Sequence, residues 1–455
     1  MFNLRKYSYV ILWVTLVLVV VTVWVFGKED TSDYIKDKSE TSSAVPKTDE
    51  IGEESESSSA EEFEESDSEE TGKSTEETTV EREFSSESEN ILETASEIKQ
   101  EKMTGIWIPF MSLSTEEKTE AAFKENFEEI VQTSRADGFN ALFVHIRPYS
   151  DSYYPSEYFP WTHYLTGEQG VDPDFDPMEF MVEYAHKNDM EFHAWINPLR
   201  VKTNETPKNL SGDNPYEVLK NDYPFYFMEY EGAVYLNPAY QYIRTLIANG
   251  AAEIVRKYDV DGIHFDDYFY PSEEGGYDLT AYESYVKTVA EPLPLLDWRS
   301  ANISTMVSEV YSAVKRENPK VDFGISPAGN LDNNMKIGAN IYEWCKSPGY
   351  IDYICPQLYY SYDNPALGYS QALDNWMNLE RHENLKMYIG IGLYKAGSDA
   401  DDGTWLEDGD IIKRQIEDAE ARDTDGVLLY AYDYLHKEET QQEMENARAV
   451  LGKVN

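Results

Sequence analysis

The sequence predicts an α/β fold, namely a (β/α)8 barrel that follows a transmembrane anchor and a disordered acidic linker. Three observations in this chain of 455 residues support that organisation. An apolar run lies near the N-terminus, a Ser/Glu-rich stretch with few apolar residues follows it, and eight short apolar runs then alternate with amphipathic segments. We therefore divide the chain into an anchor at 1–27, a linker at 28–102 and a barrel at 103–455.

The anchor is predicted from the uninterrupted apolar run between Tyr9 and Phe26. Its length is close to the ~20 residues that cross the hydrocarbon core of a membrane. Arg5 and Lys6 precede the run, and basic residues favour the cytoplasmic side, so we expect the rest of the chain outside the cytoplasm. The run lacks the small-residue cleavage site of a removable signal peptide, which favours an uncleaved signal anchor over a cleaved signal.

The linker is rich in Ser, Thr and Glu and poor in apolar residues. Such a composition cannot bury enough apolar surface to offset the chain entropy that is lost on folding. We therefore expect a self-repelling, disordered spacer that holds the folded part away from the membrane.

Beyond the linker, eight short runs have the character of strands that are buried on both faces, because most of them lack polar alternation. They are Gly105–Pro109, Ala141–Arg147, Glu191–Asn197, Gly262–Asp267, Asp322–Ser326, Ile351–Tyr359, Lys386–Leu393 and Gly426–Asp433. The amphipathic segments between them are Phe123–Ala136, Pro177–Asn188, Gln241–Tyr258, Ile303–Asn318, Ala372–Asn384 and Gly409–Ala421. This alternation matches a (β/α)8 barrel. A doubly wound sheet would also alternate, but the first run lacks the glycine-rich turn of a nucleotide-binding sheet.

The balance of charges and cysteines excludes several classes of partner. The chain has 86 Asp and Glu against 38 Lys and Arg, a net charge of −48, so no nucleic-acid partner is expected. Cys345 and Cys355 are the only cysteines, which excludes a four-cysteine zinc site, an iron–sulfur cluster and a disulfide framework. Because Cys355 lies in an apolar run, the sequence favours two free thiols over a bridge. No cofactor is predicted.

Polar and aromatic residues gather at the carboxyl ends of the predicted strands, where the chemistry of such a barrel takes place. Five such clusters favour a bound ligand over a structural hydrogen-bond layer. Tyr and Trp can cover the apolar face of a sugar ring, while amides, imidazoles and carboxylates bind its hydroxyl groups. The predicted sugar-binding residues, with Trp195, Tyr359 and Tyr432 as stacking surfaces, are His145, Arg147, Trp195, Asn197, His264, Tyr268, Asn330, Gln357, Tyr359, Tyr360, Tyr432 and Asp433.

Asp266 and Asp267 are the best-placed acids for hydrolysis of a glycosidic bond. This reaction needs a proton donor and a group that stabilises an oxocarbenium-like centre. Adjacent strand residues point to opposite faces, so both acids can address one site only where the strand has ended, and Pro271 fits such a turn. Repulsion between close carboxylates raises one pKa, which prepares one Asp as an acid. A catalytic metal is disfavoured, because the H-x-H and H-E-x-x-H spacings are absent.

Several motifs occur in order between Thr104 and Tyr434. They are GIWIPF, HIRPYSDSYYPSEYFPW, FHAWINPLRV, YLNPAY, DGIHFDDYFYP, GISPAGN, YIDYICPQLYY and MYIGIGLYKAG. This series closely resembles the glycosyl hydrolase-like 10 family of bacterial surface proteins. The resemblance implies a (β/α)8 barrel that acts on glycans outside the cytoplasm. It also implies a polysaccharide substrate, namely peptidoglycan glycan strands and particularly strands that lack stem peptides.

The segment from Tyr258 to Tyr268 is similar to the fourth strand of several barrels that cleave N-acetylhexosamines. In the O-linked N-acetylglucosamine hydrolases, the first of two adjacent Asp residues polarises the substrate's acetamide, which acts as nucleophile, and the second is the general acid. This likeness implies that Asp266 orients the acetamide and that Asp267 donates the proton. Family 18 chitinases are also similar, but their catalytic Glu falls at Tyr268, which rules out a direct chitinase assignment.

Other mechanisms remain open. An amylase-type reading matches G-x-R-x-D to the segment from Gly262 to Asp266 and makes Asp266 a covalent nucleophile, but it lacks the expected Glu after the fifth strand. Asp433, Glu157 and Asp151 are candidates for a second carboxylate. Three hypotheses follow: an anchored glycosidase that uses substrate assistance, a two-carboxylate glycosidase that acts on another polysaccharide, and a non-catalytic glycan-binding barrel.

Overall fold

The computed structural model describes residues 102–406 and 408–451. The predicted anchor, and the predicted linker up to residue 101, lie outside the described residues. Within the described ranges, none of the helices combines the length and the apolar character that a membrane span requires.

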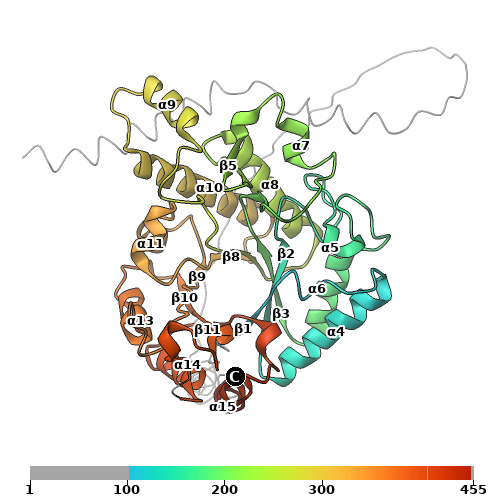
Figure 1. Cartoon of the computed structure of the whole chain (residues 1–455), viewed down its shortest axis with the longest axis vertical. Helices are drawn as coiled ribbons and strands as arrows, with labels where there is room; N and C mark the ends of the chain where they lie inside the picture. The colour runs from blue at the N-terminus through green and yellow to red at the C-terminus, as the bar shows by residue number, and fades with distance from the viewer. Residues whose placement is uncertain (1–101, 407, 452–455) are drawn as a thin grey trace, which may run out of the picture. The chain divides into compact units, whose positions relative to one another are not determined.

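Eight parallel strands close into a barrel, as the eight apolar runs predicted (Figure 1). They are β1 Met103–Ile108, β2 Ala141–Arg147, β3 Glu191–Ile196, β7 Gly262–Phe265, β8 Asp322–Ile325, β9 Tyr353–Ile354, β10 Lys386–Ile391 and β11 Gly426–Leu429. Their order around the barrel is β1-β11-β10-β9-β8-β7-β3-β2. Each predicted run overlaps one strand, and most runs continue past the strand's end into the following loop, where the polar residues lie.

Helices form the outer layer of the barrel (Figure 1). They are α4 Glu120–Ala136, α5 His163–Thr166, α6 Pro177–Lys187, α7 Pro215–Leu219, α8 Gln241–Lys257, α9 Leu279–Thr288, α10 Leu295–Glu317, α11 Leu331–Lys336, α12 Ile341–Lys346, α13 Tyr369–Met377, α14 Ile411–Ala421 and α15 Gln441–Leu451. Polar caps fix where two long helices begin: Thr119 accepts the backbone N–H of Ala122 in α4, and Asp176 accepts those of Met178 and Glu179 in α6.

Two apolar clusters build the core. A large one lies between the strands and the helices, and a smaller one contains the residues that alternate inward along the strands, among them Trp107, Phe143 and Tyr353. Glycines make room for these rings: a Cβ on Gly324 would lie 2.2 Å from the ring of Tyr353. Cys345 and Cys355 are both buried and form no bridge, as predicted.

A small antiparallel sheet is inserted between β3 and α8. Its strands are β4 Arg200–Lys202, β5 Phe227–Tyr230 and β6 Ala233–Leu236, in the order β4-β6-β5, and α7 and the short 3-10 helix η2 at Pro224–Tyr226 accompany them. Because the insertion follows the carboxyl end of β3, it belongs to the same end of the barrel as the predicted site. We call it the accessory sheet. The sequence did not predict it, since its strands have only three or four residues.

Candidate active site

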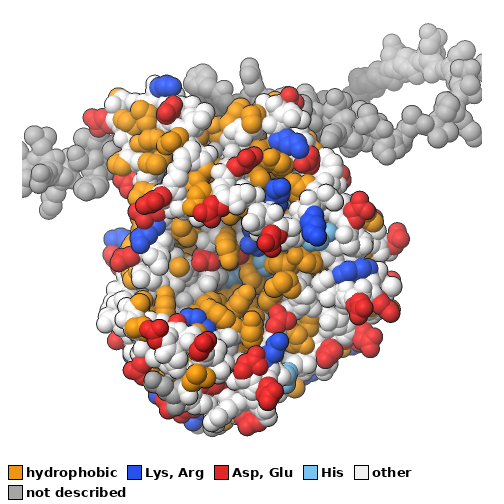
Figure 2. All heavy atoms as spheres, in the orientation of Figure 1, with side chains coloured by type: hydrophobic (Ala, Val, Ile, Leu, Met, Phe, Trp, Pro, Cys, Tyr) orange, Lys and Arg blue, Asp and Glu red, His pale blue; other side chains and the backbone are white. Residues whose placement is uncertain are grey.

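The carboxyl end of the barrel carries the candidate site. Figure 2 shows the molecule in the orientation of Figure 1 with a hollow at its centre, where hydrophobic side chains gather beside acidic ones. Asp266 and Asp267 follow directly after β7, where the strand has ended, as the sequence predicted. Both carboxylates therefore belong to the end of the barrel that opens into this hollow.

Asp266 is held rigidly and is only 3% exposed. One of its oxygens, Oδ2, accepts the Nε1–H of Trp195 at 3.0 Å and the Nδ2–H of Asn197 at 3.2 Å. The other oxygen, Oδ1, accepts the backbone N–H of Tyr268 at 3.2 Å. Burial raises the pKa of Asp266 to about 7, the positive charge of Arg200 opposes this, and the charge of Asp267 adds to it. The carboxyl group is thus fixed in position and titrates near neutral pH.

Asp267 is held by fewer contacts than Asp266. Its Oδ1 accepts the Nε2–H of Gln357 at 3.1 Å, and the same amide also donates to the backbone oxygen of Ser326 at 2.8 Å. Burial raises the pKa of Asp267 above its ordinary value. Gln357 therefore orients Asp267 from β9's side of the barrel and leaves the second carboxyl oxygen, Oδ2, available to hold a proton.

Arg200 lies beside the acid pair, although sequence reasoning did not single it out. Its guanidinium carbon lies 4.9 Å from the ring centre of Tyr149 and 5.0 Å from that of Tyr268. The Nε–H donates to the backbone oxygen of Pro148 at 3.0 Å. Tyr268, which was predicted to bind sugar, is 52% exposed at the rim of the hollow. The guanidinium of Arg200 thus lies between two aromatic rings and next to the two carboxyl groups.

Aromatic rings line the side of the site formed by β9, β10 and β11. The ring of Tyr359, a predicted stacking residue, lies 5.7 Å from the rings of both Tyr394 and Tyr430 and 6.5 Å from that of Trp107. Burial raises the pKa of Tyr430 to about 12, and the charges of Asp266 and Asp433 add to the shift. Tyr430 and Tyr394 therefore join Tyr359 as aromatic residues of the site.

Trp195 and His145 form a stack beneath the acids. Their ring centres are 3.7 Å apart and nearly parallel, at 12°. His145 is 2% exposed, and burial lowers its pKa well below the ordinary value, which keeps the ring neutral. Trp195 was predicted as a surface for a sugar ring. The structure corrects this placement, because His145 covers one face of the indole and its N–H binds Asp266.

Arg147 is turned away from the site by a β-bulge. The register between β2 and β3 shifts between His145 and Arg147, so simple alternation fails at this point. The guanidinium donates to the backbone oxygen of Gly250 in α8 at 3.1 Å and to the hydroxyl of Tyr154. We therefore correct the prediction that Arg147 binds sugar: it ties β2 to the helical layer.

His264 lies too deep in the barrel to reach a ligand. It is 0% exposed. Its Nε2 lies 3.1 Å from the Nε1 of Trp107 and 3.0 Å from the hydroxyl of Ser326, and its Nδ1 lies 3.0 Å from the hydroxyl of Tyr353. The predicted sugar contact is corrected here as well, since His264 belongs to a hydrogen-bonded layer below Asp266.

Three other predicted residues face outward. They lie three to six residues past the ends of β8, β9 and β11, where strand alternation no longer fixes the direction of a side chain. Asn330 uses its side chain to cap α11 by accepting the backbone N–H of Asp332 at 3.0 Å. Tyr360 packs against the outer core, next to Tyr359, which faces the site. Tyr432 packs there too, close to α4. Burial raises the pKa of Tyr432, a hydrogen bond with Thr133 of α4 lowers it, and the charge of Glu129 of α4 raises it. These placements correct the corresponding predictions.

The candidates for a second carboxylate are spread apart. Asp433 is exposed at the rim, where both of its oxygens accept the hydroxyl of Ser112 at 2.9 Å. Asp151 is fully buried in the loop after β2, and burial raises its pKa to about 6. Glu157 is exposed, and its backbone N–H binds Glu253 of α8 on the outer layer. Of the three, only Asp433 shares a neighbour, Tyr430, with Asp266.

Comparisons with known proteins agree with this architecture. The model of the family described as Glycosyl hydrolase-like 10 matches residues 102–407. Glycosyl hydrolase YngK of Bacillus subtilis (strain 168) is 35% identical over 319 residues, which are 65% of this chain and 61% of that protein. Glycosyl hydrolase DigH of Escherichia coli (strain K12) is 31% identical over 331 residues, which are 67% of this chain and 74% of that protein.

A solved structure shows the same fold at low identity. The catalytic domain of a β-amylase from Paenibacillus polymyxa superimposes with a TM-score of 0.54 at 11% identity, over 78% of this chain and 99% of that one. The chain spans about three fifths of the length of the Bacillus subtilis relative, and 74% of the Escherichia coli one. On the family match over most of the barrel and these two relatives, the chain belongs to the glycosyl hydrolase-like 10 family.

Proposed function

We propose that this chain is a glycoside hydrolase that cleaves N-acetylated cell-wall glycan, namely peptidoglycan strands poor in stem peptides. The observation that carries this proposal is the pair Asp266 and Asp267, two adjacent carboxyl groups held in different environments at the end of β7. Three N–H donors fix Asp266, whereas the amide of Gln357 and the backbone N–H of Asp267 itself bind the Asp267 carboxyl group. Two carboxyl groups with distinct surroundings fit two distinct catalytic roles.

Asp266 acts in this proposal as the residue that orients the substrate's acetamide. Each carboxylate oxygen can accept about two hydrogen bonds. Because Oδ1 of Asp266 accepts only the N–H of Tyr268 within the described chain, it can accept a further N–H from an acetamide. As the acetamide oxygen attacks the anomeric carbon, the acetamide N–H gains positive charge, and the ionised carboxylate stabilises that charge. The fixed position of Asp266 suits this electrostatic role.

Asp267 acts as the general acid. Burial raises its pKa, and a carboxyl group with a raised pKa can keep the proton that the leaving oxygen needs. The two carboxyl groups titrate as a coupled pair, because the charge of either one raises the pKa of the other. A substrate acetamide N–H that binds Oδ1 favours the ionised form of Asp266, which leaves the proton of the pair on Asp267. Once the bond has broken, the ionised Asp267 takes a proton from the water that opens the cyclised intermediate.

A two-carboxylate mechanism is the second candidate, with Asp433 as the partner of Asp266. The observation in its favour is that both acids act on the pKa of Tyr430, which places them on the same side of the site. Asp433 is exposed and bound to Ser112, however, whereas the acid pair is adjacent in the chain. We therefore favour substrate assistance by the pair.

Product analysis tests the proposed function. The full chain should release N-acetylated oligosaccharides, detected by mass spectrometry, from purified glycan strands without stem peptides, and fewer from strands that carry them. An Asp267→Asn variant of the full chain, prepared in the same way, should release little oligosaccharide. Binding without any product would support the non-catalytic barrel, and equal release from both kinds of strand would contradict the preference for strands poor in stem peptides.

We also propose that the chain is a single-pass membrane protein with the barrel outside the cytoplasm. This rests on the apolar run from Tyr9 to Phe26 and on the basic residues before it. The full chain should fractionate with membranes and keep its N-terminal residues. A surface-exposed protein whose sequence begins near Lys28 would show that the segment is removed instead.

A further inference from the structure

We propose that the accessory sheet continues the glycan-binding cleft, so that a row formed by Tyr268, Tyr235 and Tyr230 leads from the acid pair to a distal site for further sugar units. This inference rests on the proposed function and extends it. The ligand at the distal site is an N-acetylated segment of the same glycan chain. A row of this kind suits an enzyme that cuts within long chains.

The row begins next to the acids. The backbone N–H of Tyr268 binds Asp266, and its exposed ring covers the guanidinium of Arg200. Arg200 lies in β4 and is paired with Tyr235 of β6. Burial raises the pKa of Tyr235. The charge of Arg200 lowers this pKa, and Glu231 and Tyr230 raise it further. The accessory sheet is therefore joined to the catalytic end of the barrel through Arg200.

The row continues along the hairpin of β5 and β6. In the ladder, Tyr230 is paired with Ala233, and Tyr235 lies two residues further along β6. Residues two apart on a strand share a face, so Tyr230 and Tyr235 lie on the same face of the sheet. The ring of Tyr230 packs edge-on against that of Tyr277 at 5.7 Å, which holds it in place. From Tyr235 to Ala233, the partner of Tyr230, the row lengthens by about 7 Å.

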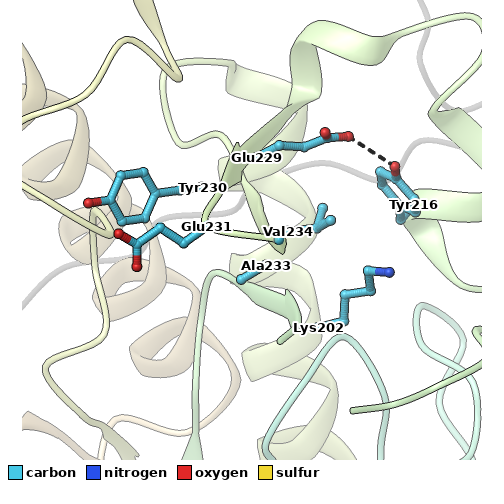
Figure 3. A pocket seen from close by; sticks show the side chains of 8 residues that line it. Lys202, Tyr216, Glu229, Tyr230, Glu231, Ala233 and Val234 are labelled. Carbon is cyan, nitrogen blue, oxygen red and sulfur yellow. Dashed lines mark hydrogen bonds between the residues drawn. The ribbon is translucent and has the colours of Figure 1, made fainter. Parts of the chain in front are cut away.

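A pocket of about 340 Å³ lies at the tip of the hairpin, where the row reaches Tyr230 (Figure 3). This volume lies at the lower end of the ~300–1,000 Å³ of ligand pockets. Its lining is the hairpin from Glu229 to Val234 together with Lys202 and Tyr216. In Figure 3, Tyr230 and Glu231 lie to one side of the hairpin, and Glu229, which accepts the hydroxyl of Tyr216 at 3.2 Å, lies to the other.

The side of the hairpin that carries the row can bind a sugar. Tyr230 offers an amphipathic ring, and Glu231 offers an acceptor for hydroxyl and acetamide N–H groups. Tyr216 and Glu229 lie on the other side of the hairpin, so they do not contact a sugar unit that rests on Tyr230.

The test uses the full chain and a series of N-acetylated oligosaccharides of increasing length. In the wild type, kcat/KM should rise with length until the row is filled. Tyr230→Ala should lower the ratio of kcat/KM for the longest to the shortest chain by about 2- to 10-fold, as expected when one aromatic contact is lost. Tyr230→Phe keeps the ring and should keep most of that ratio.

Tyr223→Ala is the matched control. Tyr223 is an exposed tyrosine of the same insertion, but its ring contacts Phe225 and Tyr226 and lies outside the row. This variant should leave the ratio unchanged. An unchanged ratio in Tyr230→Ala, or an equal fall in Tyr223→Ala, would overturn the distal site.

Calorimetry separates failure of this inference from failure of the proposed function. In an Asp267→Asn background, which removes turnover, Tyr230→Ala should weaken binding of the longest chain about 2- to 10-fold. This loss would support the distal site even if the wild type cut no chain. Equal affinity with and without Tyr230→Ala would overturn the distal site even if the enzyme proved to be an active glycosidase.

Discussion

Asp267→Asn should lower kcat on natural N-acetylated glycan by about 10²–10⁴-fold, because it removes the proton that the leaving oxygen requires. The change keeps the size of the side chain and an oxygen that can accept the amide of Gln357, so the site should keep its shape. KM should change little. Steady-state kinetics with chains of defined length, followed by chromatography of the products, measure the effect.

The leaving group provides the internal control for Asp267. The aryl group of an aryl glycoside of the same oligosaccharide departs without protonation, so the kcat/KM of the variant, which reports bond cleavage, should stay close to the wild-type value even though the later opening of the intermediate still uses Asp267. Asp433→Asn is the matched control variant, since it removes an exposed carboxylate from the rim of the same hollow. It should leave both substrates almost unaffected. Equal losses on both substrates in Asp267→Asn, or a larger loss in Asp433→Asn, would favour the two-carboxylate mechanism.

Asp266→Asn should slow both kinds of substrate, by about 10²–10³-fold, because it removes the negative charge that stabilises the acetamide as the bond breaks. A thiazoline that mimics the cyclised intermediate should inhibit the wild type and bind this variant poorly. A variant that lost activity on natural glycan only would show that Asp266 acts on the leaving group instead.

Because the pKa of Asp266 is raised, the unfolding free energy of Asp266→Asn should differ from that of the wild type by an amount that depends on pH. Burial, partly opposed by Arg200, raises the pKa to about 7, so the folded state retains a proton that the unfolded chain has released above pH ~4. The stability that this group contributes is therefore full at low pH and is lost as the pH rises through about 7. Relative to the wild type, Asp266→Asn should gain unfolding free energy between roughly pH 4 and pH 8, by at most ~4 kcal/mol.

Urea unfolding at several pH values measures this gain. Asp433→Asn again serves as the control, because it removes one exposed carboxylate from the rim of the same hollow. A pH-independent difference for Asp266→Asn would contradict the raised pKa.

The barrel could be predicted from the sequence because its strands are buried on both faces. Runs such as Ala141–Arg147 read as continuous apolar strands, and each of the eight runs overlaps one strand of the barrel. The accessory sheet could not be predicted in this way. Its strands are short, and its pairing joins Arg200 to Tyr235 across more than thirty residues, a contact that hydrophobic periodicity does not report.

The structure brings only part of the predicted site together. Asp266, Asp267, Asn197 and Gln357 lie in contact because polar residues at the ends of barrel strands converge. The sequence does not show which of two neighbouring residues faces inward. The register shift after His145 turns Arg147 outward. Asn330, Tyr360 and Tyr432 lie three to six residues past the ends of their strands, where alternation no longer applies.

Arg200 and Tyr430 were missed for different reasons. Arg200 lies three residues after Asn197 in the motif that ends the third strand, and its backbone N–H binds the Asn197 side chain at 3.1 Å. Its closeness to Asn197 in the sequence was the available signal. The direction of the Arg200 side chain, however, is set by the turn at Pro198 and not by strand alternation. Tyr430 directly follows β11, so alternation along that strand would have placed it inward beside Leu428.

The central claim, that the substrate's own acetamide attacks under the guidance of Asp266, is tested most directly by changing the basicity of that group. Aryl glycosides of one oligosaccharide can carry N-acetyl, N-fluoroacetyl, N-difluoroacetyl or N-trifluoroacetyl groups while the leaving group stays the same. For the wild-type chain, kcat/KM should fall steeply along this series as the acyl oxygen becomes a weaker nucleophile. A rate that stays level across the series would contradict substrate assistance and place the nucleophile on the protein.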